Sequence, residues 1–242
     1  MKTCSLLIVL GLVYVASYLM AVAALADYRP VSDTSAPEGP TISTAPRYFQ
    51  PVDPSAPRSP TTPTGTRRGG CFAGDTAPSI FAPNRFVGLT ASAQPTLTWF
   101  LPDDDSVPVE FSVYTIEPSG DYGLVHLQML PYTPGINQYQ LPVELAPDTR
   151  YLWQLVLQCN PNRPSSALIY EAELEFAPPV ENAMPEGATV LELSKTYAKA
   201  GYWYDAISVL GQGQQSDVAD MRAALLNDLV LAETALDSSN SQ

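Results

Sequence analysis

The cysteines are the first residues in this sequence that could carry chemistry. A thiolate can act as a nucleophile or hold a metal ion, whereas two cysteines in an oxidising compartment normally pair. The chain has three, Cys4, Cys71 and Cys159, and Cys4 belongs to an N-terminal segment that export would remove. Strand alternation places Cys159 on the core side of its strand, where a thiolate is costly. We therefore predict one Cys71–Cys159 disulfide rather than a reactive thiol.

The single histidine, His126, could serve as a general base or a zinc ligand. It lies in LVHLQML, residues 124–130, where it alternates with Val125 and Leu127 and shares the polar face with Gln128. No H-E-x-x-H or C-x-x-C spacing accompanies it. We interpret His126 as a surface strand residue. No catalytic residue and no cofactor are predicted from these patterns.

A run of acidic residues, PDDDS at 102–106, offers oxygens to a hard cation. Calcium takes six or more oxygens, and its common loops carry Gly and Glu at offsets that do not occur here. Asp103 and Asp105 are therefore only weak metal candidates, and we interpret the run as a solvated hairpin loop. An exported hydrolase using two carboxylates is an alternative, although nothing in the sequence singles out a pair.

The aromatic cluster GYWYD contains Tyr202, Trp203 and Tyr204. If exposed, these rings would form a platform for a sugar or a partner helix, and they are the candidate interaction surface. The alternative, which we favour, is that Trp203 fills the gap between a helical hairpin and the rest of the domain.

The N-terminal segment, residues 1–26, has the composition of an export signal. Lys2 precedes an apolar run that ends in Ala24-Leu25-Ala26, a small-residue pattern typical of signal-peptide cleavage. Residues 4–26 are uncharged and long enough to span a bilayer, so an uncleaved anchor is the alternative. Residues 27–70 contain nine prolines among Ser, Thr and Gly, and are predicted to be a disordered linker.

Residues 71–177 show the alternation of short strands, about seven in number, separated by Pro, Gly and Asp clusters. The first is expected near Phe86–Thr90, and the others in PTLTWFL, VPVEFSVYTI, LVHLQML, INQYQL, RYLWQLVLQC and SALIYEAELEF. We predict a mainly β fold, a seven-stranded immunoglobulin-like or fibronectin-like sandwich. In it Val125, Leu127 and Met129 share the face opposite the polar face of His126, and Glu171, Glu173 and Glu175 point to water.

The hydrophobic period becomes helical after Pro178-Pro179. Residues 178–236 are predicted to hold a helical hairpin followed by a third helix, with a disordered tail over 237–242. The stretch ELSKTYAKAGYWYDAISVL is similar to part of one tetratricopeptide repeat, and LAPDTRYLW resembles the approach to strand F of fibronectin type III domains. The second similarity implies that Tyr151 is a corner tyrosine, whose hydroxyl bonds to upstream backbone.

Several separated segments together resemble one family. TRRGGC, PTLTWFLP, LPYTPGI, APDTRYLWQLVLQCNPNRPS and YAKAGYWYDAISVL occur, over about residues 66–235, in the order seen in the cyanobacterial domain-of-unknown-function family 928. The resemblance implies an exported, envelope-associated protein and no particular activity.

Charge limits the partners that this chain can have. Residues 71–177 carry 12 acidic residues against three arginines, and residues 178–242 carry nine acidic against three basic. Such a surface argues against nucleic acid and anionic lipid as partners, and leaves membrane contact to an uncleaved N-terminal segment. We therefore expect a non-catalytic protein of the periplasm, cell envelope or cell surface that binds unknown envelope proteins; a carbohydrate-binding domain is the alternative.

Overall fold

The computed structural model describes residues 71–72, 76–103, 107–160, 162–179 and 187–239. The predicted signal segment 1–26, the predicted linker 27–70 and Asp105 lie outside these described residues. All of the described residues belong to one compact unit of the chain, Thr44–Gln242.

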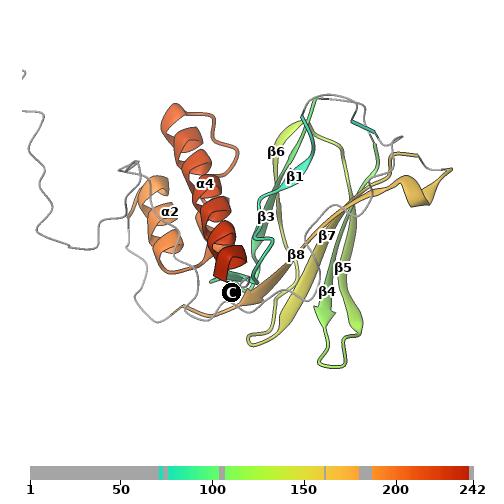
Figure 1. The fold of residues 1–242 in the computed structure, drawn as a ribbon, viewed down its shortest axis with the longest axis horizontal. Coiled ribbons are helices and arrows are strands. Elements are labelled where there is room, and N and C mark those ends of the chain that lie inside the picture. Colours follow the sequence, from blue (N-terminus) through green and yellow to red (C-terminus); the bar gives the residue numbers. More distant parts are fainter. Residues whose placement is uncertain (1–70, 73–75, 104–106, 161, 180–186, 240–242) are drawn as a thin grey trace, which may run out of the picture. The chain divides into compact units, whose positions relative to one another are not determined.

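The strands form two sheets, as Figure 1 shows. The first sheet has the order β1-β3-β6, with β1 at Ser79–Ile80, β3 at Thr96–Leu101 and β6 at Gly135–Gln140. The second sheet has the order β2-β8-β7-β4-β5, with these strands at Gly88–Thr90, Leu168–Phe176, Arg150–Leu157, Val109–Ile116 and Tyr122–Leu130. The fold is thus mainly β, and the described residues hold eight strands rather than seven. The additional one is β1, whose two residues are too few for alternation to be recognised.

The two sheets meet through the apolar sides that alternation predicts. Trp99 on β3 and Tyr139 on β6 place their rings 6.1 Å and 4.8 Å from the ring of Phe111 on β4. Trp153 on β7 lies 6.1 Å from the same ring. Phe111 and Trp153 are completely buried, so large rings from both sheets occupy the centre of this core.

The disulfide closes the described fold at its N-terminal side. Cys71 and Cys159 are bonded across 88 residues of sequence, with their Cα atoms 5.0 Å apart. Cys159 follows β7 by two residues, so the bond holds the beginning of the described chain beside the end of a central strand. Tyr151, on the same strand, accepts a 2.9 Å hydrogen bond through its Oη from the backbone N–H of Ala146. This is the bond to upstream backbone expected of a corner tyrosine.

The helices follow the strands: α2 spans Val190–Lys199, α3 spans Trp203–Ser208 and α4 spans Ser216–Ser239. Residues 164–166 form a short 3-10 helix. Thr189 caps α2 in a capping box with Glu192, which satisfies backbone donors at the helix start. Gly201 has a φ of 84° and separates α2 from α3, a conformation that favours glycine. Helix α4 continues to Ser239, three residues into the segment predicted as a disordered tail.

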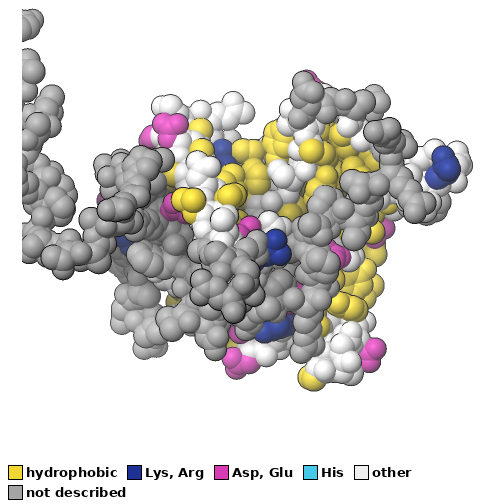
Figure 2. Space-filling view, in the orientation of Figure 1, with side chains coloured by type: hydrophobic (Ala, Val, Ile, Leu, Met, Phe, Trp, Pro, Cys, Tyr) yellow, Lys and Arg dark blue, Asp and Glu magenta, His cyan; other side chains and the backbone are white. Residues whose placement is uncertain are grey.

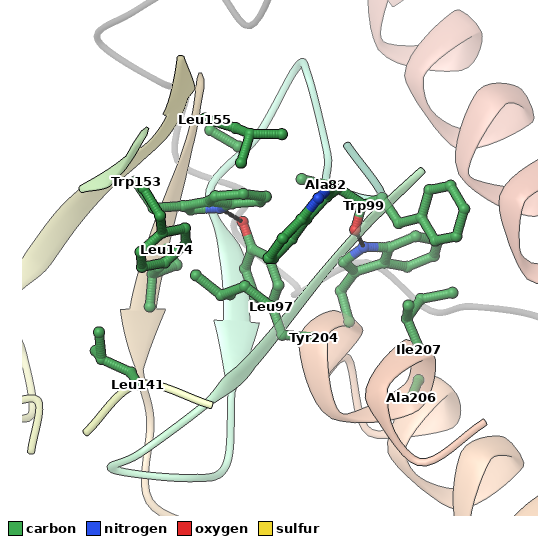
Figure 3. Packing of buried hydrophobic residues seen from close by; sticks show 14 of the residues in the cluster. Ala82, Leu97, Trp99, Leu141, Trp153, Leu155, Leu174, Tyr204, Ala206 and Ile207 are labelled. Atoms are coloured by element: carbon green, nitrogen blue, oxygen red, sulfur yellow. Dashed lines mark hydrogen bonds between the residues drawn. The ribbon is translucent and has the colours of Figure 1, made fainter. Parts of the chain in front are cut away.

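Helix α3 joins the helices to both sheets. The indole Nε1 of Trp203 donates a 2.9 Å hydrogen bond to the carbonyl of Phe81. The Tyr204 hydroxyl accepts a 3.1 Å bond from Trp153 Nε1 and donates a 3.0 Å bond to the carbonyl of Glu173. Figure 3 shows the Tyr204 ring among core residues, including Trp153, Leu97 and Leu174. The helices and sheets therefore share one core.

Candidate interaction surface

The outer face of the five-stranded sheet is open along its β5 edge, whereas Ser112, Leu152 and Glu173 nearer its centre are 0%, 4% and 1% exposed. On β4, Val109, Phe111 and Val113 face the core and are fully buried, so Glu110, Ser112 and Tyr114 point to the opposite, outer side. Strand register extends this side to the neighbouring strands, with Tyr114 opposite Leu152 on β7 and opposite Leu124 on β5.

Strand β5 contributes a row of exposed apolar side chains to this face. Tyr122, Leu127 and Met129 are each 48% exposed, and Leu124 is 60% exposed. Figure 2 shows hydrophobic side chains at the surface where β5 lies. β5 ends the order β2-β8-β7-β4-β5, so one of its sides has no strand partner within this sheet. An edge strand with a continuous apolar row is a surface that another chain can cover.

This arrangement overturns the predicted orientation of β5. Leu127 pairs with Ser112 and Met129 with Glu110, so both lie on the outer face instead of the core face. A bulge between Val113 and Tyr114 shifts the register, which brings Leu124 onto the same outer face. Alternation in the sequence separates two faces but does not say which is buried, and here the register with β4 decides it.

His126 is correspondingly on the inner side and is not a surface residue. It pairs with Val113, which faces the core, and its ring lies 6.2 Å from that of Phe111. Its Nε2 is 2.9 Å from the Tyr139 hydroxyl of β6. The half-buried imidazole therefore links the edges of the two sheets.

A hollow of about 400 Å³ opens on the outer face next to this row. Its lining crosses four adjacent strands of the sheet: Tyr122 from β5, Tyr114 from β4, Leu152 and Gln154 from β7, and Glu171 from β8. The aromatic end of the hollow thus lies toward the sheet edge, and its carboxylate lies toward β8. We call these five residues the tyrosine groove.

The acidic end of the tyrosine groove is partly ordered by side-chain contacts. Gln154 Nε2 donates a 2.8 Å hydrogen bond to Glu171 Oε2, which orients that carboxylate along the face. The next acidic residue, Glu173, is only 1% exposed, and Arg150 Nη1 lies 3.9 Å from its Oε2. The prediction that Glu173 faces water is therefore wrong, since its carboxylate is buried beside Arg150.

The favoured prediction, that Trp203 fills the gap between the helices and the sheets, is confirmed, and the alternative of an exposed aromatic platform is wrong. Trp203 and Tyr204 are 0% and 2% exposed, and Tyr202 is half-buried. Their hydrogen bonds to Phe81, Trp153 and Glu173 leave no open face for a ligand on the first two rings. Burial also raises the pKa of the Tyr204 hydroxyl. These residues attach the helices to the sheets and are not an interaction surface.

The weak metal candidate is only partly within the described chain. Asp103 is exposed, and Asp105 lies outside the described residues. Among the residues that the structure describes, no group of three or more His, Cys, Asp or Glu is arranged to hold a metal ion. Within the same residues, no helix has the length and apolar composition needed to cross a membrane.

The residues that line the groove were not identified from the sequence. Tyr114 and Tyr122 belong to stretches recognised as strand and turn, but their common location depends on the bulge and on strand order. One signal was available: Tyr114 occupies the side of VPVEFSVYTI opposite Phe111 and Val113, where a polar residue is usual. A large aromatic on the solvent side of a strand indicates a covered or binding face.

Comparison with known proteins identifies the family. The family model named Domain of Unknown Function (DUF928) matches residues 62–240. The chain belongs to the DUF928 family. The match begins within the proline-rich segment and includes both sheets and the helices. No curated protein matches the DUF928 chain. Among solved structures, it is similar to a superoxide reductase (neelaredoxin) E23A from Ignicoccus hospitalis, with 14% identity over 42% of this chain and 80% of that chain and a TM-score of 0.28.

Proposed function

We propose that this protein is an exported, non-catalytic interaction module of the cell envelope. In this proposal its two sheets form a fibronectin-like sandwich, and the outer face along β5 binds an envelope protein. The apolar row on β5 carries the proposal, because four large side chains, each about half exposed or more, lie together on an edge strand. The Cys71–Cys159 disulfide supports export, since such bonds persist in oxidising compartments.

The acidic surface agrees with this proposal. The chain has a formal net charge of −13, which disfavours nucleic acid and anionic lipid surfaces as ligands. An apolar row on a sheet whose outer face also carries Glu110 and Glu171 instead suits a protein partner with an apolar centre and a basic rim.

Affinity capture with surface variants tests the proposal. The full chain is immobilised and exposed to a cell-envelope extract, and captured proteins are quantified by mass spectrometry. Leu127→Lys/Met129→Lys should reduce recovery of a specific partner about tenfold, because a partner would bury two unpaired charges. Val230→Lys/Leu231→Lys, which changes two exposed side chains of α4, is the matched control. Equal recovery with the wild type and the β5 variant would contradict the proposal.

Carbohydrate binding is a second candidate function, favoured by the tyrosine groove. Tyr114 and Tyr122 offer aromatic faces, and Gln154 and Glu171 offer polar groups beside them, which is a usual composition for sugar sites. Calorimetric titration with envelope polysaccharides, comparing the wild type with Tyr122→Ala, distinguishes this function from protein binding. Loss of a measurable heat in Tyr122→Ala would support it, and the absence of heat with the wild type would exclude those sugars.

A further inference from the structure

We propose that the tyrosine groove binds the chain's own proline segment, PVDPSAPRSPTTP, residues 51–63. The inference rests on the outer face used in the proposed function and names an occupant for its groove. The segment itself lies outside the described residues, so the argument starts from its sequence and from the geometry of the groove.

The prolines of this segment recur at every third position: Pro51, Pro54, Pro57, Pro60 and Pro63. A polyproline II helix has three residues per turn, so this spacing would place all five rings along one edge. Proline-rich segments of this kind dock into aromatic-lined grooves, where the preformed helix loses little entropy on binding. Three of the four earlier prolines, Pro37, Pro40 and Pro46, are also three and six residues apart, but Ser43 interrupts them and they are out of phase with the later five. The uninterrupted run of five prolines thus lies entirely within the proposed ligand.

The groove has the length and chemistry for such a ligand. Its lining crosses four strands, and three strand spacings correspond to about 14 Å. About five or six residues of polyproline II helix cover this distance, at about 3.1 Å each. Two prolines of the segment, one polyproline II turn apart, would then pack on the rings of Tyr122 and Tyr114. The leucine side chain of Leu152 provides the apolar floor between the rings and the acidic end.

Charge sets the direction and the register of the segment. Arg58 directly follows Pro57 and is the sole basic residue within 51–63. If Pro54 and Pro57 lie on the tyrosines, Arg58 reaches toward β8, where Glu171 is located. Gln154 already bonds one oxygen of that carboxylate, which leaves the other oxygen for the guanidinium. Residues 51–70 carry three arginines against one aspartate, opposite in sign to the acidic outer face of β8.

The connection to the described fold allows this contact. The chain after Arg58 reaches Cys71 in 13 residues, and Cys71 is bonded to Cys159. A flexible chain of that length has a root-mean-square end-to-end distance of about 20 Å. Along extended β7 and its continuation, Gln154 and Cys159 are at most about 17 Å apart. Because the tether length matches the span, the effective concentration of the segment at the groove is on the order of millimolar.

Photo-crosslinking in the full, oxidised chain tests the inference. Leu124, which is exposed beside the groove, is replaced by p-benzoylphenylalanine, and crosslinked peptides are mapped by mass spectrometry. We expect an intramolecular crosslink to residues 51–63 in the monomer band. A crosslink to the same residues only in a dimer band that grows with concentration would assign the groove to a second copy and overturn the inference. Crosslinks only to other segments, or none, would also overturn it.

Substitutions within the segment make the test specific. Arg58→Glu should lower the crosslink yield about tenfold, since it places a carboxylate against Glu171. Arg47→Glu, outside the period, is the matched control and should leave the yield unchanged. Pro54→Ala/Pro57→Ala should also lower the yield, whereas Pro40→Ala/Pro46→Ala should not. If each test variant gave the same crosslink yield as its control variant, the proposed register of the segment in the groove would be wrong.

These variants also separate the inference from the proposed function. The two arginine variants and the two double proline variants change only residues that precede the described fold. We therefore expect them to leave its folding unchanged, and near-ultraviolet circular dichroism can verify this. A failed crosslink with retained, β5-dependent capture of an envelope protein would refute the intramolecular contact alone. A successful crosslink without such capture would refute the interaction module alone.

Discussion

Asp205 is the buried titratable side chain that connects α3 to the end of β2. Its Oδ2 accepts a 2.8 Å hydrogen bond from the backbone N–H of Ala91, and it is 8% exposed. Burial raises the pKa of Asp205 from 3.8 to about 6, against the lowering effects of hydrogen bonds from Ala91 and Thr90. The charge of Asp205 in turn adds to the raised pKa of the nearby Tyr197 and Tyr202 hydroxyls, which burial mainly causes.

The raised pKa of Asp205 predicts the direction of a pH effect on stability. Between about pH 4 and pH 6 the folded state binds the proton more tightly than the unfolded state, so this residue's contribution to the free energy of unfolding falls as pH rises. A shift of about two pKa units corresponds to about 3 kcal/mol. Asp205→Asn carries no charge at any of these pH values and should remove this contribution.

Urea denaturation of the wild type and Asp205→Asn from pH 3.5 to 7.5 measures the effect. The stability of the variant relative to the wild type should increase by up to about 3 kcal/mol across this range, because only the wild type must bury a charge at the higher pH. A difference between the two proteins that stays constant with pH would show that Asp205 has an ordinary pKa.

At the scale of elements, α4 holds the end of α3 through one buried arginine. Arg222 is 7% exposed, and its Nη2 donates to the carbonyls of Leu210, Gly211 and Gly213 at 3.4, 2.9 and 3.0 Å. Burial lowers the pKa of Arg222, but arginine remains charged at neutral pH. These bonds pair the carbonyls that follow α3, so the link orders the α3–α4 connection.

Replacing Arg222 tests the strength of this link. Arg222→Met keeps most of the side-chain volume but removes hydrogen bonds from a charged donor to the carbonyls of Gly211 and Gly213, so we expect the free energy of unfolding to fall by about 2–3 kcal/mol. Arg163→Met, at an exposed arginine, is the control and should change it by less than about 0.5 kcal/mol. Chemical denaturation at pH 7 compares them. Equal effects would show that the bonds of Arg222 add nothing to stability.

The elements also show which parts of the structure are readable from the sequence. Strands such as β3 and β7 were predictable because every second residue is large and apolar, and the turn residues between them are distinctive. The orientation of β5 was not, because Leu127 and His126 offer plausible residues for both faces, and the choice depends on pairing with β4. The tyrosine groove was missed for the same reason: its five lining residues lie on four strands and meet only through register.

At the scale of the whole molecule, the sheets and helices should unfold together. Trp203 and Tyr204 of α3 are anchored to Phe81, Trp153 and Glu173 by hydrogen bonds, and their rings belong to the same buried cluster as the sheet residues. Strong connections of this kind favour a single cooperative transition. The disulfide acts on this whole unit, because the two bonded cysteines enclose seven of the eight strands.

The last prediction follows from the length of that enclosed loop. A link across 88 residues restricts the unfolded chain and stabilises the folded state by about 4 kcal/mol in the chain-entropy model. Cys71→Ser/Cys159→Ser should therefore lower the free energy of unfolding by about that amount, and Cys4→Ser should leave it unchanged. Helical circular dichroism and tryptophan fluorescence, followed in the same urea titration, should shift to lower urea together. If only fluorescence shifted, the helices would be stable without the sheets, and the shared core would not couple the two.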